Sequence, residues 1–199
     1  MIYPNRSVAG RHLAEQLKKN YLNQINNAVL LSILKGGYEI GKEVEKVLKL
    51  PHLVIPAVKI KPESEADNTL GAYCFGHIYH SKYISRAILN KYLPYAQEEF
   101  ELICQTTNLD QDQYSICTNK EIIIVDDFIQ YGYTVSAVCQ FLATLNPKKI
   151  YVATPVCSAD CIDFENNIEE IFLNIETDFY TPNQYYSDFP KLDLSVLEN

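Results

Sequence analysis

A run of four β-branched apolar residues that ends in two carboxylates constrains this chain most. Residues 122–125 read Ile-Ile-Ile-Val, and Asp126 and Asp127 follow directly. Continuous apolar runs of this kind are typical of strands buried on both faces of a parallel sheet. Because successive residues of a strand point to opposite faces, the two carboxylates at its end can serve two different roles. The run therefore predicts a central strand with an acidic pair at its carboxyl end.

The segment after the acidic pair predicts a turn that leads into a helix. Gly132 and Thr134 come first, and apolar residues then recur at helical spacing from Val135 to Leu142. A helix N-terminus behind a glycine-bearing turn presents free backbone N–H groups, which bind phosphate. Carboxylates beside such a site bind sugar hydroxyls or hydrated Mg²⁺. The stretch predicts sites for a sugar and its phosphate; the alternative is an ordinary turn with a solvated acidic pair.

A second candidate site is the sequence Lys35-Gly36-Gly37, which follows a predicted strand at residues 28–33. Two glycines let the backbone approach an anion closely, and a lysine adds positive charge. The alternative interpretation is a tight turn with a surface lysine, placed between the strand and a helix that continues to about Leu48.

Strands and helices alternate along the chain, which predicts an α/β fold with a doubly wound, mostly parallel sheet. The remaining elements are expected as a helix at 7–23 capped by Ser7, strands at 53–58, 73–79, 150–153 and 171–175, a helix pair broken at Pro94 within 82–105, and a helix at 159–168. The polar residues 59–72 predict a surface loop or a lid, and 106–119 predict a loop. Ligands bind at the carboxyl ends of strands in such sheets, where both candidate sites fall.

The composition predicts one globular domain over residues 1–199, with a core at about 25–175 and a tail, 176–199, packed on it. Hydrophobic residues make up 47% of the chain, which favours a packed core over disorder. A net charge of −8 argues against broad binding to nucleic acid or to anionic membranes. No apolar run approaches the ~20 residues of a membrane span, and no signal-peptide core is present. We therefore expect a cytoplasmic protein, whose six cysteines stay reduced.

Cysteines and histidines in two places raise the question of a metal site. Cys74, His77 and His80 lie at three-residue spacing, and Cys157 and Cys161 are four residues apart. No CxxC pair accompanies either group, whereas structural zinc normally takes four ligands at tighter spacings. We therefore favour buried thiols and scattered histidines over a zinc site.

The stretch from Glu121 to Thr134 resembles the phosphoribosyl pyrophosphate (PRPP) motif of type I phosphoribosyltransferases, in which a hydrophobic strand runs into two acidic residues and a Gly/Thr-rich phosphate loop. Further patterns resemble one branch of that family, the stand-alone predicted phosphoribosyltransferases. They are Tyr3-x-x-Arg6-x-x-Ala9-Gly10-x-x-Leu13-Ala14, Lys35-Gly36-Gly37, Leu70-Gly71-Ala72 and the terminal Tyr-Tyr-Ser-Asp-Phe-Pro at 185–190. The resemblance implies a five-stranded sheet with a small hood and a flexible loop.

The resemblance also implies a reaction: transfer of a phosphoribosyl group between pyrophosphate and a nitrogenous base, with Mg²⁺, in a protein that is commonly a homodimer. Asp126 and Asp127 would bind the ribose hydroxyls and, through ligand or water, the Mg²⁺. The 5′-phosphate would be bound by Gln130, Tyr131, Gly132, Tyr133 and Thr134. Pyrophosphate would be bound by Lys35, Gly36 and Gly37. Lys59, at the start of the flexible loop, would act in catalysis with the two aspartates.

Departures from the family pattern support a second hypothesis. Lys35 replaces an arginine, and Gln130 stands where purine-specific relatives place an acidic residue that can act as a base. Tyr131 and Tyr133 replace small residues of the phosphate loop. The alternative is thus a catalytically silent module that binds a nucleotide or a sugar phosphate. The direction of the two tyrosine side chains separates the hypotheses, because rings pointing inward would fill the phosphate site.

Overall fold

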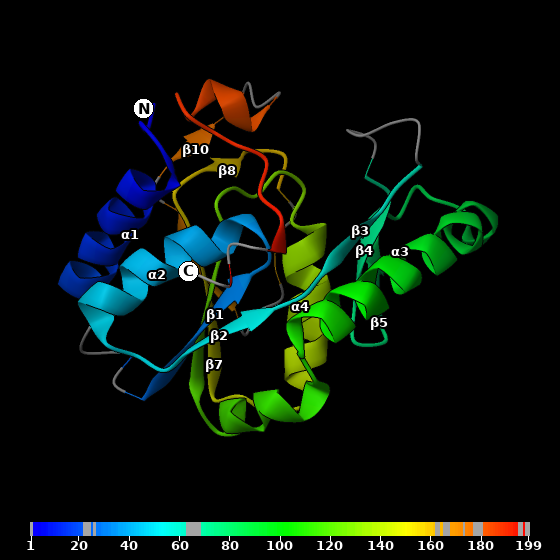
Figure 1. Cartoon of the computed structure of the whole chain (residues 1–199), viewed down its shortest axis with the longest axis horizontal. Helices are drawn as coiled ribbons and strands as arrows, with labels where there is room; N and C mark the ends of the chain where they lie inside the picture. Colours follow the sequence, from blue (N-terminus) through cyan, green and yellow to red (C-terminus); the bar gives the residue numbers. More distant parts are fainter. Residues whose placement is uncertain are drawn as a thin grey trace.

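A five-stranded parallel sheet lies at the centre of the computed structural model, which describes residues 2–21, 25, 27–62, 69–161, 164, 168–172, 174–176, 181–194 and 197 (Figure 1). Its strands are β1 (Ala28–Ile33), β2 (His52–Ile55), β6 (Glu121–Val125), β7 (Lys149–Thr154) and β9 (Ile168–Phe172). They are ordered β2-β1-β6-β7-β9, and every neighbouring pair is parallel. The predicted α/β fold is confirmed.

The strands divide their side chains between two hydrophobic cores, as a sheet covered on both faces requires. In β6, Ile123 packs in the core that contains α1 (Arg6–Tyr21) and α2 (Gly36–Leu48). Ile124 packs on the opposite face, in the core that contains α4 (Tyr133–Ala143). Helices on both faces make the sheet doubly wound, and α1 and α2 lie side by side in Figure 1.

The direction of winding reverses between β1 and β6. From β1 the chain passes through α2 to β2 on one side, and from β6 it passes through α4 to β7 on the other. The loops after two such strands diverge and leave a crevice at the carboxyl ends of the strands, where ligands of open α/β sheets bind. Here these loops are residues 34–35 and 126–132, and both candidate sites lie in these loops and in the first turns of the helices that follow.

Residues 58–62 and 69–107 form a small lobe beside the main sheet, the hood expected from the sequence. Strands β3 (Val58–Ile60), β4 (Gly71–Cys74) and β5 (His77–His80) make an antiparallel sheet in the order β3-β4-β5, and α3 (Arg86–Thr107) packs on it. The polar segment 59–72, predicted as a loop or a lid, therefore begins in β3 and ends in β4. Its residues 63–68 lie outside the described part of the chain.

Two segments that were each predicted as one strand form two separate strands in the structure. The strand predicted at 53–58 is divided at Pro56, because proline has no N–H to donate to a ladder. The strand predicted at 73–79 is the hairpin of β4 and β5. Its turn places Phe75 and Gly76 at φ 41° and 84°, and consecutive positive φ values are typical of tight hairpin turns.

Two predictions around α3 were also wrong. The helix pair predicted at 82–105 is a single helix that continues through Pro94. Pro94 is on the exposed side, and the apolar residues of the opposite side hold both halves of the helix against the small sheet. The loop predicted at 106–119 contains a 3-10 helix, η1 (Gln111–Cys117).

The helix predicted at 159–168 was wrong as well. Its described residues lie in turns and loop until β9 begins at Ile168. Its apolar residues recur at helical spacing, yet they pack on the α4 core from a loop and a strand. The last strand, predicted at 171–175, is divided between β9 and the short strand β10 (Ile175–Glu176), which pairs with β8 (Cys157–Ser158).

Helix α1 begins before the predicted cap. The capping side chain is that of Asn5, whose Oδ1 accepts the Val8 N–H at 3.0 Å, and not that of Ser7. The earlier start brings Arg6 into the first turn of α1, on the face buried against α2. The predicted end at residue 23 lies outside the described residues.

The two ends of the chain meet on the α1 side of the sheet. Tyr3 forms a parallel bridge with Tyr186, and the Tyr3 N–H donates to the Tyr185 carbonyl at 2.7 Å. Both tail tyrosines are buried in the core of α1 and α2. The aromatic tail, following the 3-10 helix η2 (Pro182–Gln184), is therefore part of the main core.

The described helices include none that is long and apolar enough to cross a membrane. All six cysteines are free thiols, and Cys74 is buried between the main sheet and the small lobe. Within the described residues, no three histidine, cysteine or acidic side chains gather as a metal site.

Candidate active site

The loops after β1 and β6 open on one cavity of about 450 Å³. The residues predicted for the site that line it are Lys35, Gly36, Lys59, Asp126, Asp127, Gln130, Tyr131, Gly132, Tyr133 and Thr134. Gly37 lies behind this lining, against the end of β6. The structure thus brings together residues that are almost 100 positions apart in the sequence.

The loop after β6 presents a row of unpaired backbone donors to this cavity. Among the described residues, none accepts a hydrogen bond from the N–H groups of residues 130–134. Gly132 has φ 78°, a left-handed conformation that turns the chain into α4. The loop is anchored from behind, because the Ile129 N–H donates to the Val156 carbonyl at 3.0 Å. Fixed N–H groups at a helix N-terminus are suited to hold an anion.

The loop after β1 is built in the same way and touches the first. The N–H groups of residues 35–37 likewise have no acceptor within the described residues. A Cβ added at Gly36 would lie 1.9 Å from Asp127 Oδ2, and one added at Gly37 would lie 2.6 Å from the Val125 carbonyl oxygen. Only glycine permits this approach, so the two loops are packed together at the mouths of adjacent strands. The peptide bond between Leu34 and Lys35 is cis.

Asp126 faces the cavity with few partners. Its Oδ1 accepts the Asp127 N–H at 2.9 Å, and its carboxyl group also contacts the neighbouring Asp127 carboxyl. The residue keeps partial exposure, but its carboxyl group lies deep enough for burial to raise its pKa well above the ordinary value. The negative charge of Asp127 raises the pKa further, and Lys59 opposes the shift. An under-paired carboxylate with a raised pKa is typical of functional sites.

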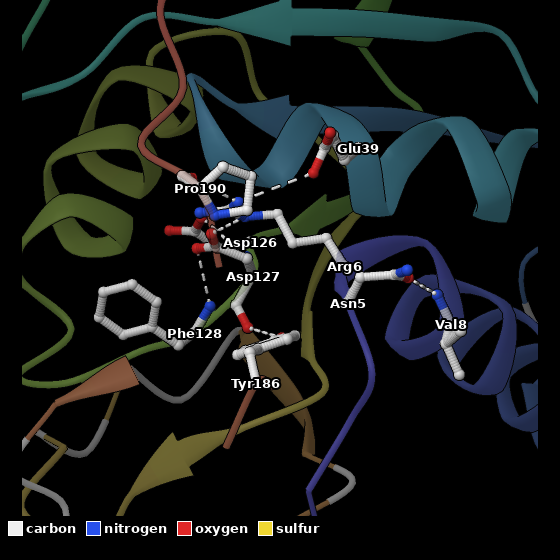
Figure 2. Close-up of polar contacts among 9 residues, drawn as sticks. All are labelled: Asn5, Arg6, Val8, Glu39, Asp126, Asp127, Phe128, Tyr186 and Pro190. Atoms are coloured by element: carbon white, nitrogen blue, oxygen red, sulfur yellow. Dashed lines mark hydrogen bonds and ion pairs between the residues drawn. The ribbon is translucent and has the colours of Figure 1, made fainter. Parts of the chain in front are cut away.

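Asp127 also lines the cavity, but its carboxylate is fully engaged by other groups of the protein (Figure 2). Its Oδ2 accepts the Arg6 Nε–H at 2.6 Å, and its Oδ1 accepts the Phe128 N–H at 3.0 Å. The Tyr186 hydroxyl donates to its backbone carbonyl at 2.6 Å. Arg6 and Asp127 are each 5% exposed, so this ion pair is buried. Asp127, which the sequence predicts as a ribose-binding residue, is therefore held by three groups of the protein itself.

The cavity is locally basic in a chain of net charge −8. Its basic lining residues are Arg6, Lys35, Lys59, Lys61 and Lys191, and its acidic ones are Glu99, Asp126 and Asp127. Because Arg6 is paired with Asp127, the lysines are the cations left to meet a ligand. Such a local excess of positive charge raises the concentration of anionic ligands at the site.

Tyr131 and Tyr133 stack on each other and on the small lobe. The ring centroids of Tyr131 and Tyr133 are 5.6 Å apart, and those of Tyr133 and Tyr79 of β5 are 6.0 Å apart. Tyr133 also packs against the α4 core. Its ring is therefore held between two other tyrosines, on the side of the loop next to the small lobe, and the N–H groups of the loop stay unpaired.

The chain matches the model of the phosphoribosyl transferase domain over residues 2–190. It belongs to this family. The family predicted from the PRPP-like stretch and the terminal motifs is therefore confirmed, and it is a family of transferases.

Known relatives agree with this assignment. The hypoxanthine phosphoribosyltransferase of Buchnera aphidicola subsp. Schizaphis graminum (strain Sg) is 25% identical over 170 residues, which cover 85% of this chain and 76% of that protein. The solved structure of TT1426 from Thermus thermophilus is 21% identical, with a TM-score of 0.71 over 97% of this chain and 94% of that one. A purine phosphoribosyltransferase from Pyrococcus horikoshii Ot3 is 16% identical, with a TM-score of 0.51 over 93% and 90%. These structures share the fold.

Several residues of this phosphoribosyltransferase cavity were missed by the sequence reasoning. They are Arg6 from α1, Lys61, Thr69, Glu99 and Ile103 from the small lobe, and Phe189, Lys191 and Leu192 from the tail. Arg6 had a usable signal, because it continues the apolar stripe of α1 in steps of three and four residues. An arginine at a core position predicts a buried partner. The tail residues had no such signal, since nothing local to them indicates where the tail docks.

Proposed function

We propose that the protein binds PRPP and transfers its phosphoribosyl group between pyrophosphate and a nitrogenous base. The observation that carries this proposal is the pair of loops at residues 35–37 and 130–134, whose unpaired N–H groups open on one basic cavity. PRPP carries phosphate groups at two positions of its ribose. Two anion-binding loops on adjacent strands, with a carboxylate between them, match that arrangement.

The residues divide into three binding functions. The N–H groups of residues 130–134, with the Thr134 hydroxyl, bind the 5′-phosphate. Lys35 and the backbone of Gly36 bind the pyrophosphate. Asp126 binds the ribose hydroxyls, since its carboxylate faces the cavity and has unused lone pairs. The tyrosine stack supports this division, because it leaves the donors of the phosphate loop unpaired.

The chemistry would be chiefly electrostatic. As the bond between ribose and pyrophosphate breaks, positive charge develops on the ribose and negative charge on the leaving group. Asp126 would stabilise the first charge, and Lys35 and Lys59, which line the same cavity, would stabilise the second. Lys59 is placed over the face of Phe128, with its Nζ 5.6 Å from the ring centroid, at the entrance from the small lobe. Fixed charges in a partly enclosed cavity act more strongly than in water.

The donors present also fit magnesium. Mg²⁺ takes oxygen ligands and keeps several waters, so one or two carboxylates together with substrate phosphates suffice to hold it. The Asp126 carboxylate lines the cavity and accepts one backbone N–H, whereas both oxygens of Asp127 accept hydrogen bonds from Arg6 and Phe128. When bound, the ion would neutralise charge on the pyrophosphate. We expect PRPP to bind weakly without Mg²⁺, because Asp126 and Asp127 otherwise face a strongly anionic ligand.

The acceptor base is identified by testing candidate bases in turn. Hypoxanthine is the first base to test, because the Buchnera relative is a hypoxanthine phosphoribosyltransferase. Gln130 lines the cavity and supports a second candidate function, a silent module that binds a nucleotide or a sugar phosphate. A glutamine amide cannot accept the proton that a purine loses on coupling, so a water or another group would have to do so.

A homodimer is the assembly that we propose, through the exposed face of α3. Ile88, Tyr95 and Leu102 recur there every seven residues and are 45%, 56% and 62% exposed. Lys91 and Glu98 flank Tyr95 on opposite sides in sequence. An antiparallel pair of α3 helices would bring Lys91 of each copy near Glu98 of the other, as a twofold interface requires. Light scattering on Tyr95→Glu tests it, and an unchanged mass would contradict it.

The experiment for the main proposal is a calorimetric titration with PRPP in the presence and absence of Mg²⁺, followed by a screen of bases for nucleotide formation. The transferase hypothesis expects PRPP binding that depends on Mg²⁺, and a nucleotide product with at least one base. PRPP or nucleotide binding without any product would favour the silent module. Absence of binding by PRPP and by nucleotides alike would contradict both roles of the cavity. We expect the activity in the cytoplasm, which cell fractionation tests.

A further inference from the structure

Two sequence motifs without a role in the proposed reaction meet at Asp127. One is the N-terminal pattern around Arg6, and the other is the tail at residues 185–190. Arg6 donates from Nε to Asp127 Oδ2 at 2.6 Å and from Nη1 to the Pro190 carbonyl at 2.9 Å (Figure 2). The ends of the chain therefore share one arginine, which sits on the second carboxylate of the PRPP-like stretch.

Close packing of α1 on α2 places this arginine. Gly10 lies one turn after Arg6 on the same face of α1, and a Cβ at Gly10 would come within 3.0 Å of Glu43 Cβ and of the Ile40 carbonyl oxygen. Glycine thus lets the two helices approach closely. The guanidinium of Arg6 then lies near the N-terminal turn of α2, where Glu39 Oε2 is 3.8 Å from its Nη1.

The tail holds Arg6 from the other side. The Phe189 ring lies under the guanidinium, with 3.7 Å from Cζ to the ring centroid. The Tyr186 hydroxyl donates to the Asp127 carbonyl at 2.6 Å, so the tail contacts both members of the ion pair. Lys191 and Leu192 come next and line the cavity. Docking of the tail therefore completes one wall of the ligand site.

Asp127 connects this cluster to both anion-binding loops. Its Oδ1 accepts the Phe128 N–H at the start of the phosphate loop, at 3.0 Å. Its Oδ2 lies so close to Gly36 that no Cβ would fit there. A carboxylate that is fixed by Arg6, at 5% exposure, is poorly placed to gain a further partner from the ligand but well placed to fix the loops relative to each other.

We propose that Arg6 is a positioning residue that acts through Asp127: the buried pair, clamped by the tail at 186–190, fixes the spacing of the two anion-binding loops. This inference rests on the proposed function. Because the tail contributes both to the clamp and to the cavity wall, tail docking and PRPP binding stabilise each other, and the coupling is reciprocal.

The test measures the affinity for PRPP with Mg²⁺ by calorimetry in Arg6→Gln, Arg6→Lys and Tyr186→Phe. Arg6→Gln should lose about tenfold to a hundredfold in affinity, the range found at metal sites when groups behind the direct ligands are removed. Arg6→Lys keeps the charge but not the fork geometry and should recover part of the loss. Tyr186→Phe removes one buried hydrogen bond and should lose about threefold to tenfold. Arg11→Gln is the matched control, since Arg11 is on the same helix and 54% exposed in its side chain.

A double-mutant cycle separates positioning from a general effect on folding. If Arg6 acts through Asp127, the affinity lost in Arg6→Gln and in Asp127→Asn should not add in the double variant. Additive losses would overturn the positioning role. The positioning role would also be overturned if Arg6→Gln, Arg6→Lys and Tyr186→Phe all bound PRPP as tightly as the wild-type protein does. In that case the proposed function would still stand. A wild-type protein that binds no PRPP would overturn both.

Discussion

Asp126 and Asp127 follow β6 on opposite faces of the sheet, and their carboxylates lie in opposite environments. The Asp126 carboxylate, on the cavity side, accepts one backbone N–H and has a raised pKa. Asp127, on the side of α1 and α2, is buried with Arg6 and shielded by the tail. Because strand residues alternate between faces, adjacent positions in sequence belong to different environments. Because buried polar groups are normally hydrogen-bonded, this difference supports our proposal that Asp126 serves a ligand and Asp127 the structure.

The largest loss of stability should come from removing Arg6, the partner of the buried Asp127. Arg6→Gln leaves the Asp127 carboxylate buried without its cation, and we expect the free energy of unfolding to fall by about 3–5 kcal/mol. Urea unfolding followed by circular dichroism measures this. Arg11→Gln, which removes a surface arginine with a 3.8 Å ion pair, should change it by under ~0.5 kcal/mol. Equal effects of the two variants would contradict a special role for Arg6.

A substitution at Gly36, where the two loops touch, should have an intermediate effect on stability. Gly36→Ala would place a Cβ 1.9 Å from Asp127 Oδ2, so the loop must shift. We expect a loss of about 1–3 kcal/mol in stability, as for overpacked sites, together with weaker binding of pyrophosphate in calorimetry. Gly76→Asn is the control, because a Cβ added at Gly76 would meet open space and asparagine tolerates positive φ. A Gly36→Ala protein with wild-type affinity would show that the close approach of the loops is dispensable.

The tyrosine stack offers a similar comparison between packed and ligand-facing groups. Tyr133→Ala removes two ring contacts, to Tyr79 and to Tyr131, each worth about 0.5–1.5 kcal/mol. We therefore expect the melting temperature to fall, with no gain in affinity for ribose 5-phosphate. Tyr83→Ala, at an 84% exposed tyrosine outside the stack, is the control. A gain in phosphate affinity would mean that the ring crowds the phosphate loop.

The smallest effect should be a gain of stability when the cavity-facing Asp126 is replaced by asparagine. The pKa of Asp126 is raised above its ordinary value by burial and by Asp127, so its ionised form is disfavoured in the folded protein. Its contribution to stability is full below the unfolded pKa of about 3.9 and is lost as pH rises through the higher folded value. Asp126→Asn should thus exceed wild type by ~0.5–1 kcal/mol at pH 8 and match it near pH 3.5. Unfolding at both values measures this; a less stable Asp126→Asn protein at pH 8 would contradict it.

The parts that the sequence predicted well are those where local pattern and tertiary context agree. The apolar runs at 28–33 and 122–125 became β1 and β6, and the loops that follow them became the two sides of the cavity. The small lobe was predicted poorly, because its hairpin and α3 depend on contacts between distant segments. The roles of Arg6 and the tail could not be read locally, since they arise where residues 6, 127 and 190 meet.

Asp126→Asn and Asp127→Asn are compared most directly in the same two measurements, calorimetric affinity for PRPP with Mg²⁺ and the free energy of unfolding at pH 7.5. We expect Asp126→Asn to lose about tenfold to a hundredfold in affinity, because a charged hydrogen-bond partner is removed, and to be at least as stable as wild type. We expect Asp127→Asn to be clearly less stable, because the Arg6 charge is left buried. If Asp127→Asn keeps wild-type stability while Asp126→Asn keeps wild-type affinity, the assignment of the two carboxylates is wrong.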